Sequence, residues 1–594
     1  MQNNTTDMIR SVFIRSVSVM TLSNISLFAG GLADSLLISR CLGTECTAAF
    51  GIAAPVSLII VMISLVFLTG LQNVCSSLLA AGKVDEAGRT FSASVFLELI
   101  IAALLSAFLF FFSDNAASVL VAGKEQSDQL KGYLSAYMAG FAPGMAALCL
   151  MPALMFLMYL QGRGRIAFQS VLVQLSVNIA GDLLSVYVFH GGMLGMGIAT
   201  SICHYCAVFV LIAGMARSPG ALRVSFKGVK VSDALPVVKA GAPVAPEKLY
   251  VSLRIFITNG LLLSISGSAA AAAFSVMATL QNLYNSVSIG IVATTQSAAS
   301  AFFGEKDEES LESLLKVSLL YGFMMEAAIG VLAFFTAPLA AQVFISDMSS
   351  VRYAMTVAAL RIFAFSIPLF NINATFQKYY LATGRAAYTL VFSCLNNLVF
   401  AVLSACILGQ MFGTNGVWSS FSIGELCALL CLFAFIWIKN GHFPGTLRDY
   451  MQLPAWDIDK GGIFEGSVSD EASVTRVSKE ASDHCIARGA SHRTAMLIAL
   501  CIEEMTKNII QFGAYGKKRA HIDVRIVQEK DAWRLRIRDD CKAFDPKRWL
   551  SIHEPEAPWD NIGIRMVFGM ASDVKYINLL GMNQLVICIG TKPA

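Results

Sequence analysis

The chain has 594 residues, of which 56% are hydrophobic and only 14% are charged. Soluble globular proteins carry about 25% charged residues, so this composition excludes an ordinary soluble protein. Charged residues are sparse before residue 440 and dense after it, which predicts a membrane part followed by a soluble part. The net charge of +4 is spread over loops and the C-terminal part and gives no indication of nucleic-acid binding.

Apolar runs of about 20 residues fit a helix that crosses a membrane. The sequence predicts twelve such spans, near residues 12–38, 48–72, 91–112, 132–160, 166–189, 194–215, 238–265, 269–299, 313–337, 354–381, 387–409 and 414–438. The first run is too long for a signal peptide, so we interpret it as a span.

An internal repeat relates the two halves of the apolar region. The Ala-Ala-Phe at 48–50 returns at 272–274, and Gln72 returns as Gln296, both at an offset of 224 residues. The polar segment at 82–86 has a counterpart at 304–308. Many secondary transporters consist of two repeats around a central substrate path. We therefore expect two six-helix lobes, residues 1–220 and 221–440.

The basic residues of the short loops predict the orientation, because cytoplasmic loops are enriched in Lys and Arg. One side carries Lys83, Arg89, Arg163, Arg165, Arg217, Arg223, Lys227, Lys230, Lys306 and Arg385, and the other carries Arg40, Lys124, Lys131 and Arg352. The richer side is expected to be cytoplasmic. This predicts a multi-pass protein of the plasma (inner) membrane with both termini in the cytoplasm.

Ionisable side chains inside spans cost about 2.5–3.5 kcal/mol each on insertion scales, so each is a functional candidate. Asp34 ends an apolar helix, and Asn178 and Asp182 are four residues apart and share a helix face. Thr200 lies on the next span. Such oxygen ligands suit Na⁺, and a buried carboxyl could instead hold a proton. The alternative is that these groups only cap or bridge helices, which we favour for Thr200 alone.

The second half lacks these groups. At the repeat offsets it has Thr258, Leu398 and Val402, so the acidic pair is confined to one lobe. Because a structural role would more easily persist in both halves, this asymmetry favours function for Asp34 and Asp182. Other charges expected to be buried are Glu98, Glu247, Arg254, Glu326, Arg361 and Glu425. Glu247 and Arg254 are seven residues apart, which predicts a shared network on one helix face or, alternatively, contacts between helices.

The membrane part, about residues 8–440, resembles the multidrug and toxic compound extrusion (MATE) transporters. The resemblance rests on Gly-Leu-Ala-Asp34, Leu-Gly-Thr at 42–44, Pro55, Asn178-Ile-Ala-Gly-Asp182 and the segment that ends in Thr200. In the DinF-type branch, residues of this pattern form a cation site in the N-terminal lobe. The resemblance implies export of organic cations or drugs in exchange for H⁺ or Na⁺ by alternating access. The acidic residue that another branch uses in the seventh span has no counterpart here, because Glu247 is too close to Pro243.

The C-terminal part is predicted to be a linker, residues 441–463, and one α/β domain, residues 464–594. Helices are expected at 470–488, 492–512 and 561–571, and strands at 520–528, 532–539, 573–579 and 584–590. About 130 residues are sufficient for one such domain.

Polar clusters in this domain predict a nucleotide pocket. Glu504 and Asn508 share a helix face, Asp539 ends a strand that leads to Phe544, and Gly563 lies at a helix start. Amides at a helix start favour phosphate. The sequence has no GxxxxGK[ST] motif, which excludes a P-loop motor.

These clusters resemble the GHKL (Bergerat-fold) ATPases of the anti-sigma-factor serine-kinase type. The resemblance implies Glu504 as a base, Asn508 as a Mg²⁺ ligand and Asp539 as the partner of adenine, with ATP and Mg²⁺ as cofactors. Cys541 replaces a glycine of the Asp-x-Gly box, and Asn561 replaces the first glycine of the later Gly-x-Gly box. No phospho-acceptor His box precedes the domain, which argues against a complete sensor histidine kinase.

Three functions remain open on the sequence. The first is an exporter of organic cations, driven by an ion gradient and regulated by a cytosolic ATP-binding domain, with lipids and a cytosolic protein as further partners and no nucleic acid. The second is a membrane sensor whose C-terminal domain acts as an ATPase or a serine/threonine kinase. The third is a lipid-linked oligosaccharide flippase, for which only Arg254 and Arg361 are available as cavity cations.

Overall fold

The structure is a computed structural model that describes residues 2–121, 128–217, 222, 224–225, 228–456, 460–513, 520–529, 532–552 and 562–590. The first half of the membrane part consists of α1 (Gln2–Leu37), α2 (Thr44–Ala80), α3 (Val84–Phe111), α4 (Ser113–Val121), α5 (Asp128–Phe141), α6 (Met145–Leu160), α7 (Gly164–Tyr187) and α8 (Gly192–Arg217). The second half consists of α9 (Leu235–Gly241), α10 (Val244–Gly304), α11 (Glu308–Phe344), α12 (Val351–Ala364), α13 (Ser366–Ala382), α14 (Ala386–Cys394) and α15 (Ala401–Asn440).

Nine helical segments among the described residues are long and apolar enough to cross a membrane. The pair α12 and α13, which meet at a bend of 44°, makes a tenth. Twelve spans were expected, and the difference arises in α10 and α15, which are continuous through positions where two separate spans were predicted.

Helix α10 reverses direction at Gly267, which has a positive φ of 67°. The guanidinium of Arg254 lies 5.4 Å from the centre of the Phe421 ring, and Phe274 packs on the same ring at 6.2 Å. Twenty residues of straight helix would separate Arg254 and Phe274 by about 30 Å. The two arms of α10 therefore lie antiparallel, which only a residue without a Cβ permits easily at this φ.

Helix α15 makes the same kind of hairpin at Gly413, where φ is 61°. The hydroxyl of Ser404 donates to the carbonyl of Ser420 at 3.3 Å, although 16 residues separate them. A Cβ on Gly416 would lie 1.9 Å from the carbonyl oxygen of Leu408, so only glycine permits this approach. Each of the two predicted pairs of spans is therefore present as the two arms of one helical hairpin.

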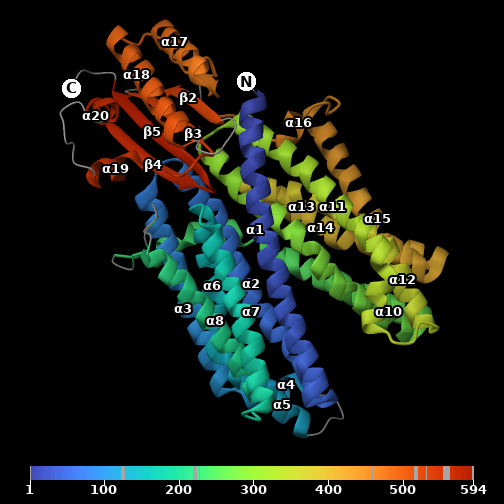
Figure 1. The fold of residues 1–594 in the computed structure, drawn as a ribbon. Coiled ribbons are helices and arrows are strands. Elements are labelled where there is room, and N and C mark those ends of the chain that lie inside the picture. Colours follow the sequence, from blue (N-terminus) through green and yellow to red (C-terminus); the bar gives the residue numbers. More distant parts are fainter. Residues whose placement is uncertain are drawn as a thin grey trace.

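The first half (α1–α8) and the second half (α9–α15) form two lobes. They lie side by side at the end that carries the C-terminal sheet and diverge away from it (Figure 1). At the sheet end the lobes touch through polar side chains: the Gln296 amide donates to the Asn73 side chain at 2.9 Å, and Thr6 donates to Ser313 at 3.2 Å. The molecule is therefore closed at this end.

The predicted linker is not a free tether. It contains the short helix α16 (Leu447–Met451) and packs against the second lobe. Arg385 donates to the carbonyl of Gln452 at 2.9 Å, and the Tyr380 hydroxyl donates to the carbonyl of Tyr450 at 2.8 Å. These bonds orient the chain where it enters the C-terminal domain.

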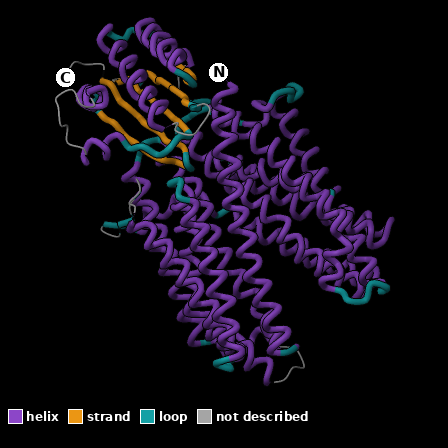
Figure 2. The backbone as a smooth tube through the Cα atoms, in the orientation of Figure 1, coloured by secondary structure: helices purple, strands orange, loops and turns teal. Residues whose placement is uncertain are grey.

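The C-terminal part is a five-stranded antiparallel sheet covered by helices on one face (Figure 2). Its elements are β1 (Ile463–Val468), α17 (Glu471–Ala487), α18 (His492–Asn508), β2 (Ile522–Gln528), β3 (Ala532–Asp539), α19 (Pro546–Ile552), α20 (Ile562–Met570), β4 (Asp573–Leu579) and β5 (Met582–Gly590), and the strand order is β1-β2-β3-β5-β4. The helices and strands that periodicity predicted are present, and β1 and α19 were not predicted.

Alternation along the strands builds the core of this domain. Val524 of β2, Leu535 of β3 and Ile587 of β5 point to the helical face and are fully buried. Trp533 is 1% exposed and is among the largest buried side chains.

We expect Trp533→Ala to destabilise the domain by about 3–5 kcal/mol, because it leaves a cavity in this core. Hydrogen exchange of the β2 and β3 amides in the full chain measures the loss. Met496→Ala, on α18 at 71% exposure, is the matched control and should leave the exchange rates unchanged. Equal protection in the two variants would contradict the assignment of this core.

Candidate functional site

Two separate sites emerge, one in the first lobe and one in the C-terminal domain. The first combines side chains of α1, α7 and α8. Asp182 is fully buried and Asn178 is 5% exposed, and the Asn178 amide lies 3.5 Å from an oxygen of Asp182. The Asp34 carboxyl interacts with both side chains. The structure thus brings Asp34 of α1 together with Asn178 and Asp182 of α7, the three residues that the sequence singled out.

The carboxyl groups of this site are incompletely satisfied. One oxygen each of Asp34 and Asp182 is buried and has no hydrogen-bond partner among the described residues. An unpaired buried charge is costly, so such a group either binds a cation or carries a proton.

Asp34, Asn178 and Thr200 line a cavity of about 240 Å³ in the first lobe. The Thr200 hydroxyl donates to the carbonyl of Met196 at 3.0 Å, so its oxygen retains acceptor capacity. That hydrogen bond lies within one helix and neither caps nor bridges helices, and the place of Thr200 in the cavity wall leaves its oxygen available as a ligand.

Gln174 and His204 also line the cavity and were not predicted as site residues. The Nδ1 of His204 lies 2.6 Å from the carbonyl of Thr200, so it carries the proton, and the Nε2 accepts from the Gln174 amide at 3.2 Å. Gln174 precedes Asn178 by four residues and His204 follows Thr200 by four. Helical spacing from the predicted residues could therefore have found them.

Buried charges of the second lobe pair differently from the prediction. Glu247 pairs with Lys378 at 2.9 Å and not with Arg254. Although Glu247 and Arg254 are two helical turns apart on α10, their side chains contact different neighbours. Arg254 instead lies near Glu425, which accepts from Asn373 at 2.6 Å. The expected network of Glu247 and Arg254 is therefore wrong, and these charges connect helices within the lobe.

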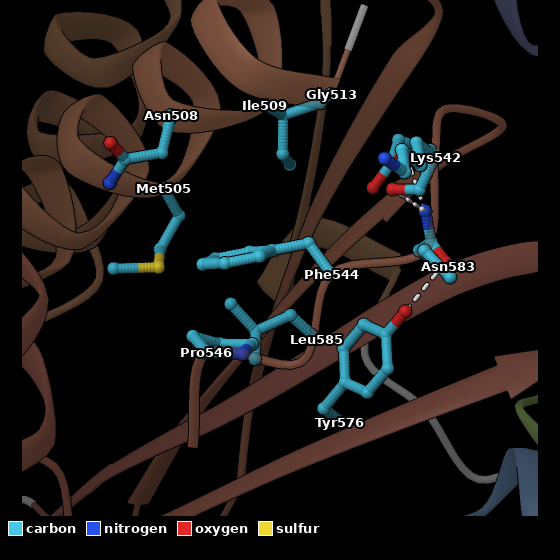
Figure 3. Close-up of a pocket in the computed structure, with 12 residues that line it drawn as sticks. Met505, Asn508, Ile509, Gly513, Lys542, Phe544, Pro546, Tyr576, Asn583 and Leu585 are labelled. Atoms are coloured by element: carbon cyan, nitrogen blue, oxygen red, sulfur yellow. Dashed lines mark hydrogen bonds between the residues drawn. The ribbon is translucent and has the colours of Figure 1, made fainter. Parts of the chain in front are cut away.

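The second site is a cavity of about 290 Å³ in the C-terminal domain. Asn508 at the end of α18, Asp539 at the end of β3 and Phe544 in the following loop all line it. The ring of Phe544, 37% exposed, projects into the cavity beside Met505 (Figure 3). Lys542 adds a positive charge to the wall.

Hydrogen bonds orient the carboxyl of Asp539. Its Oδ1 accepts from the backbone amide of Cys541 and from the Asn583 amide, both at 2.8 Å. Asn583 is in turn held by the Tyr576 hydroxyl at 2.7 Å (Figure 3). Burial raises the pKa of Asp539 to about 6. The group is ionised at neutral pH and presents a directed acceptor to the cavity.

Glu504 and Gly563 lie next to each other, and Gly563 is not among the described residues that line this cavity. A Cβ on Gly563 would be 1.9 Å from the Glu504 carboxylate, so glycine is needed there. Glu504 is not among the residues that line the cavity. Asn561, the other residue singled out near this helix start, lies outside the described residues.

The donor set of this cavity fits a nucleotide with Mg²⁺. Asp539 is an oriented acceptor for an amino group, Lys542 can meet phosphate, and Asn508 offers an amide oxygen to a hard cation. The cavity volume of about 290 Å³ is close to the lower end of the range for small-molecule sites, about 300 Å³.

Comparison with known proteins shows which family the membrane part resembles. A family model described as MatE matches residues 20–184 and 243–406, an offset of 223 residues that agrees with the predicted repeat. Multidrug export protein MepA of Staphylococcus haemolyticus is 22% identical over 423 residues, which cover 70% of this chain and 88% of that protein.

Solved structures share the fold of the same region. The MATE transporter VcmN of Vibrio cholerae is 17% identical at a TM-score of 0.67, and the match covers 75% of this chain and 100% of the VcmN chain. A MOP superfamily transporter of Pyrococcus furiosus is 19% identical at a TM-score of 0.67, and the match covers 74% of this chain and 97% of the transporter chain. With the family model matching across both lobes, the chain belongs to the MATE family of multidrug efflux transporters.

Proposed function

We propose that this protein exports organic cations or drugs across the plasma membrane in exchange for H⁺ or Na⁺, and that its C-terminal domain binds Mg-ATP and regulates the export. The observation that carries the proposal is the pair of partly unsatisfied carboxyls, Asp34 in the wall of a cavity of the first lobe and Asp182 buried behind it. Binding of the coupling ion there neutralises the pair, and release to the other side of the membrane makes the exchange directional.

The proposed topology has twelve crossings and both termini in the cytoplasm. The hairpins of α10 and α15 each add one crossing to the ten apolar segments. Basic loops near Lys83, Arg165 and Lys306 adjoin the C-terminal domain: Gly82 accepts from Lys575, Gly162 abuts Asn578, and Lys306 accepts from Arg525. The positive-inside rule then supports a cytosolic C-terminal domain, where ATP is available.

The alternatives receive less support. A serine/threonine kinase needs a base at the transferred phosphate, and Glu504 lies against Gly563 outside the cavity wall. A flippase for anionic lipid-linked sugars needs free cavity cations. Arg254 lies over Phe421 near Glu425, and Arg361 lies over Phe334.

Purified protein in sealed vesicles tests the proposal. A fluorescent organic cation is loaded, a proton or a Na⁺ gradient is imposed, and efflux is followed without ATP. We expect efflux under one of the two gradients and stimulation or inhibition by Mg-ATP on the side of the C-terminal domain. Efflux that requires ATP and ignores both gradients would contradict the proposal.

The ionisation of Asp539 predicts a pH dependence of nucleotide binding. Its pKa of about 6 lies above the ordinary value for an aspartate because of burial, so the carboxyl takes up a proton as the pH falls through 6. If the ionised form accepts from the adenine amino group, affinity falls about fourfold between pH 7.5 and 5.5.

Adenosine is the probe for this measurement, because its base does not titrate in that range. Asp573→Asn, which changes an exposed carboxylate of β4, should retain the pH dependence. Affinity for adenosine that is constant from pH 7.5 to 5.5 would exclude Asp539 as the adenine acceptor.

A further inference from the structure

The face of the C-terminal sheet that carries no helices is charged but buried. Along β3, Arg536 and Arg538 alternate with the core residues Leu535 and Ile537. Arg538 is 1% exposed and Arg536 is 7% exposed, and Arg525 of the neighbouring strand is 4% exposed. A strand with this alternation would be expected to present its arginines to solvent. Here the membrane part covers them.

The arginines meet a short acidic loop of the second lobe, between α10 and α11. Arg536 and Arg538 both bind the Glu305 carboxylate, and Arg536 binds Asp307 at 2.7 Å. Arg525 lies 3.4 Å from Asp307. Burial alone would raise the pKa of Asp307, but the three guanidinium groups hold it well below its ordinary value. Asp307 is therefore held in its ionised form, and this negative charge anchors the loop to the sheet.

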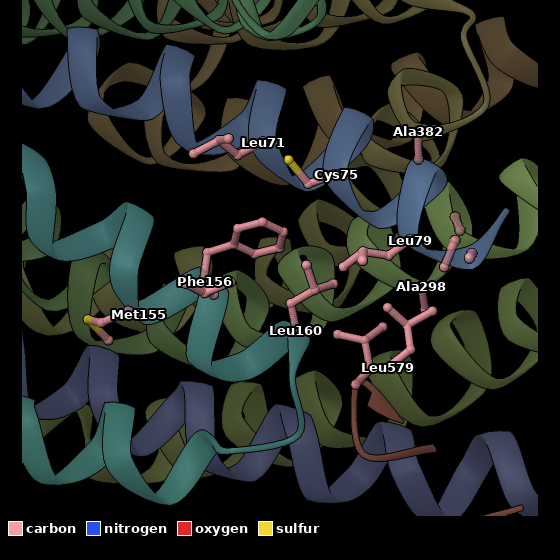
Figure 4. Close-up of a cluster of buried hydrophobic side chains, with 14 of the residues drawn as sticks. Leu71, Cys75, Leu79, Met155, Phe156, Leu160, Ala298, Ala382 and Leu579 are labelled. Atoms are coloured by element: carbon pink, nitrogen blue, oxygen red, sulfur yellow. The ribbon is translucent and has the colours of Figure 1, made fainter. Parts of the chain in front are cut away.

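A second contact joins the same sheet to the first lobe. The backbone amide of Leu580, in the β4–β5 turn, donates to the carbonyl of Leu160 at 2.8 Å. The Gln584 amide donates to the carbonyl of Ala80 at 3.4 Å. Leu579 enters an apolar cluster with Leu79, Leu160 and Ala298 (Figure 4). This cluster contains residues of both lobes and of the sheet.

The C-terminal domain therefore binds both lobes at the end where they touch each other. Alternating access requires the lobes to separate at this end when the transporter opens to the cytosol. Separation would break either the Arg536 contact with Glu305 and Asp307 or the Leu580 contact with Leu160.

We propose that the C-terminal domain is a clamp that holds the two lobes together at their cytosolic ends, and that nucleotide binding at Asp539 loosens it. The inference deepens the proposed function and depends on it for the identity of the ligand. We define the clamp interface as Arg525, Arg536, Arg538, Glu305 and Asp307 on one side and the β4–β5 turn with Leu160 and Gly162 on the other.

A short chain of hydrogen bonds connects the cavity to this interface. Asp539 accepts from Asn583, and Asn583 accepts from the Asn578 amide, each at 2.8 Å. The side-chain oxygen of Asn578 (Oδ1) abuts Gly162, where an added Cβ would approach it to 2.2 Å. An amino group of the ligand that donates to Asp539 changes the hydrogen bond between Asp539 and Asn583. Asn583 of β5 pairs with Asn578 of β4, two residues before Leu580 of the turn. The ligand thus acts on the first-lobe contact.

Arg536→Gln tests the clamp in the full chain, with Arg534→Gln as the matched control. Arg534 lies on the same strand but pairs with Glu529 away from the lobes and is 42% exposed. Asp307→Asn removes the partner charge without altering the C-terminal domain. Truncating one member of a buried ionic network leaves an unpaired charge and is strongly destabilising for that contact.

The readout is the distance between fluorescent labels introduced by unnatural amino acids at Asp85 and Lys316, both exposed near the cytosolic ends of the two lobes. Arg536→Gln and Asp307→Asn are expected to raise the separated population about tenfold or more without nucleotide. Mg-ATP should have this effect on the unaltered protein and little further effect on the variants. Adenosine binding to Arg536→Gln and Asp307→Asn verifies that the domain is folded.

Label distances in both folded variants that equal those of Arg534→Gln would overturn the clamp, and so would a distance in the unaltered protein that Mg-ATP leaves unchanged. Transport distinguishes this result from failure of the proposed function. Gradient-driven efflux with unchanged distances rejects the clamp alone, whereas shifted distances without efflux under any gradient support the clamp and reject the exporter.

Discussion

Replacement of Asp34 by asparagine is expected to lower gradient-driven efflux by about 100-fold or more, which corresponds to about 2.7 kcal/mol of lost ion affinity. Asp34 shares a buried cluster with Asn178 and Asp182, and one of its oxygens has no partner among the described residues. An amide of the same size cannot take up a proton and binds a cation weakly. The cavity keeps its shape, so substrate binding should remain.

Asp114→Asn is the control for this variant. Asp114 is an exposed carboxylate of the same lobe, paired with Lys131 at 2.9 Å at the end away from the sheet. Efflux and equilibrium binding of the fluorescent cation are measured for both variants in sealed vesicles. Retention of most of the efflux in Asp34→Asn would show that another group carries the coupling ion.

Replacement of Asp539 by asparagine is expected to weaken ATP binding by about 50-fold, or 2–3 kcal/mol, the cost of leaving a buried donor unsatisfied. The carboxylate accepts from Cys541 and Asn583 and is directed into the cavity. An amide would turn a donor toward the adenine amino group. Titration with a fluorescent ATP analogue measures the loss in the full chain.

Asp573→Asn, at the exposed start of β4, should bind the analogue normally. If Asp539→Asn also bound it normally while the hydrogen exchange of β3 was unchanged, adenine would not lie on Asp539. The nucleotide function of the cavity would then lose its main support.

Much of the fold was predictable because apolar periodicity determines it. The positions of the spans, the internal repeat and most strands of the sheet follow from local patterns. Strand β1 was missed because Ile463–Val468 contains a glycine and a glutamate and follows a polar linker. The hairpins in α10 and α15 follow from predicted span pairs, whose breaks at 266–268 and 410–413 contain Gly267 and Gly413, the glycines with positive φ.

The sites were predictable where residues share a helix and less so where they meet by packing. The spacing of Asn178 and Asp182 places them on one face, and the structure adds Asp34 from another helix. Glu247 shows the limit, because its partner Lys378 lies 131 residues away and helical spacing pointed to Arg254. The buried arginines of β3 show the same limit. Alternation predicts that they lie on the outer face of the sheet, but it does not predict which part of the molecule covers that face.

Movement of the coupling ion driven by the substrate tests the account most directly. Purified protein is placed in sealed vesicles without ATP and without an ion gradient, an organic cation gradient is imposed, and internal pH and Na⁺ are recorded. The account predicts that H⁺ or Na⁺ moves opposite to the substrate, and that Asp34→Asn abolishes this movement while Asp114→Asn retains it. Substrate movement with no opposing flux of either ion, or an opposing flux that persists in Asp34→Asn, would contradict it.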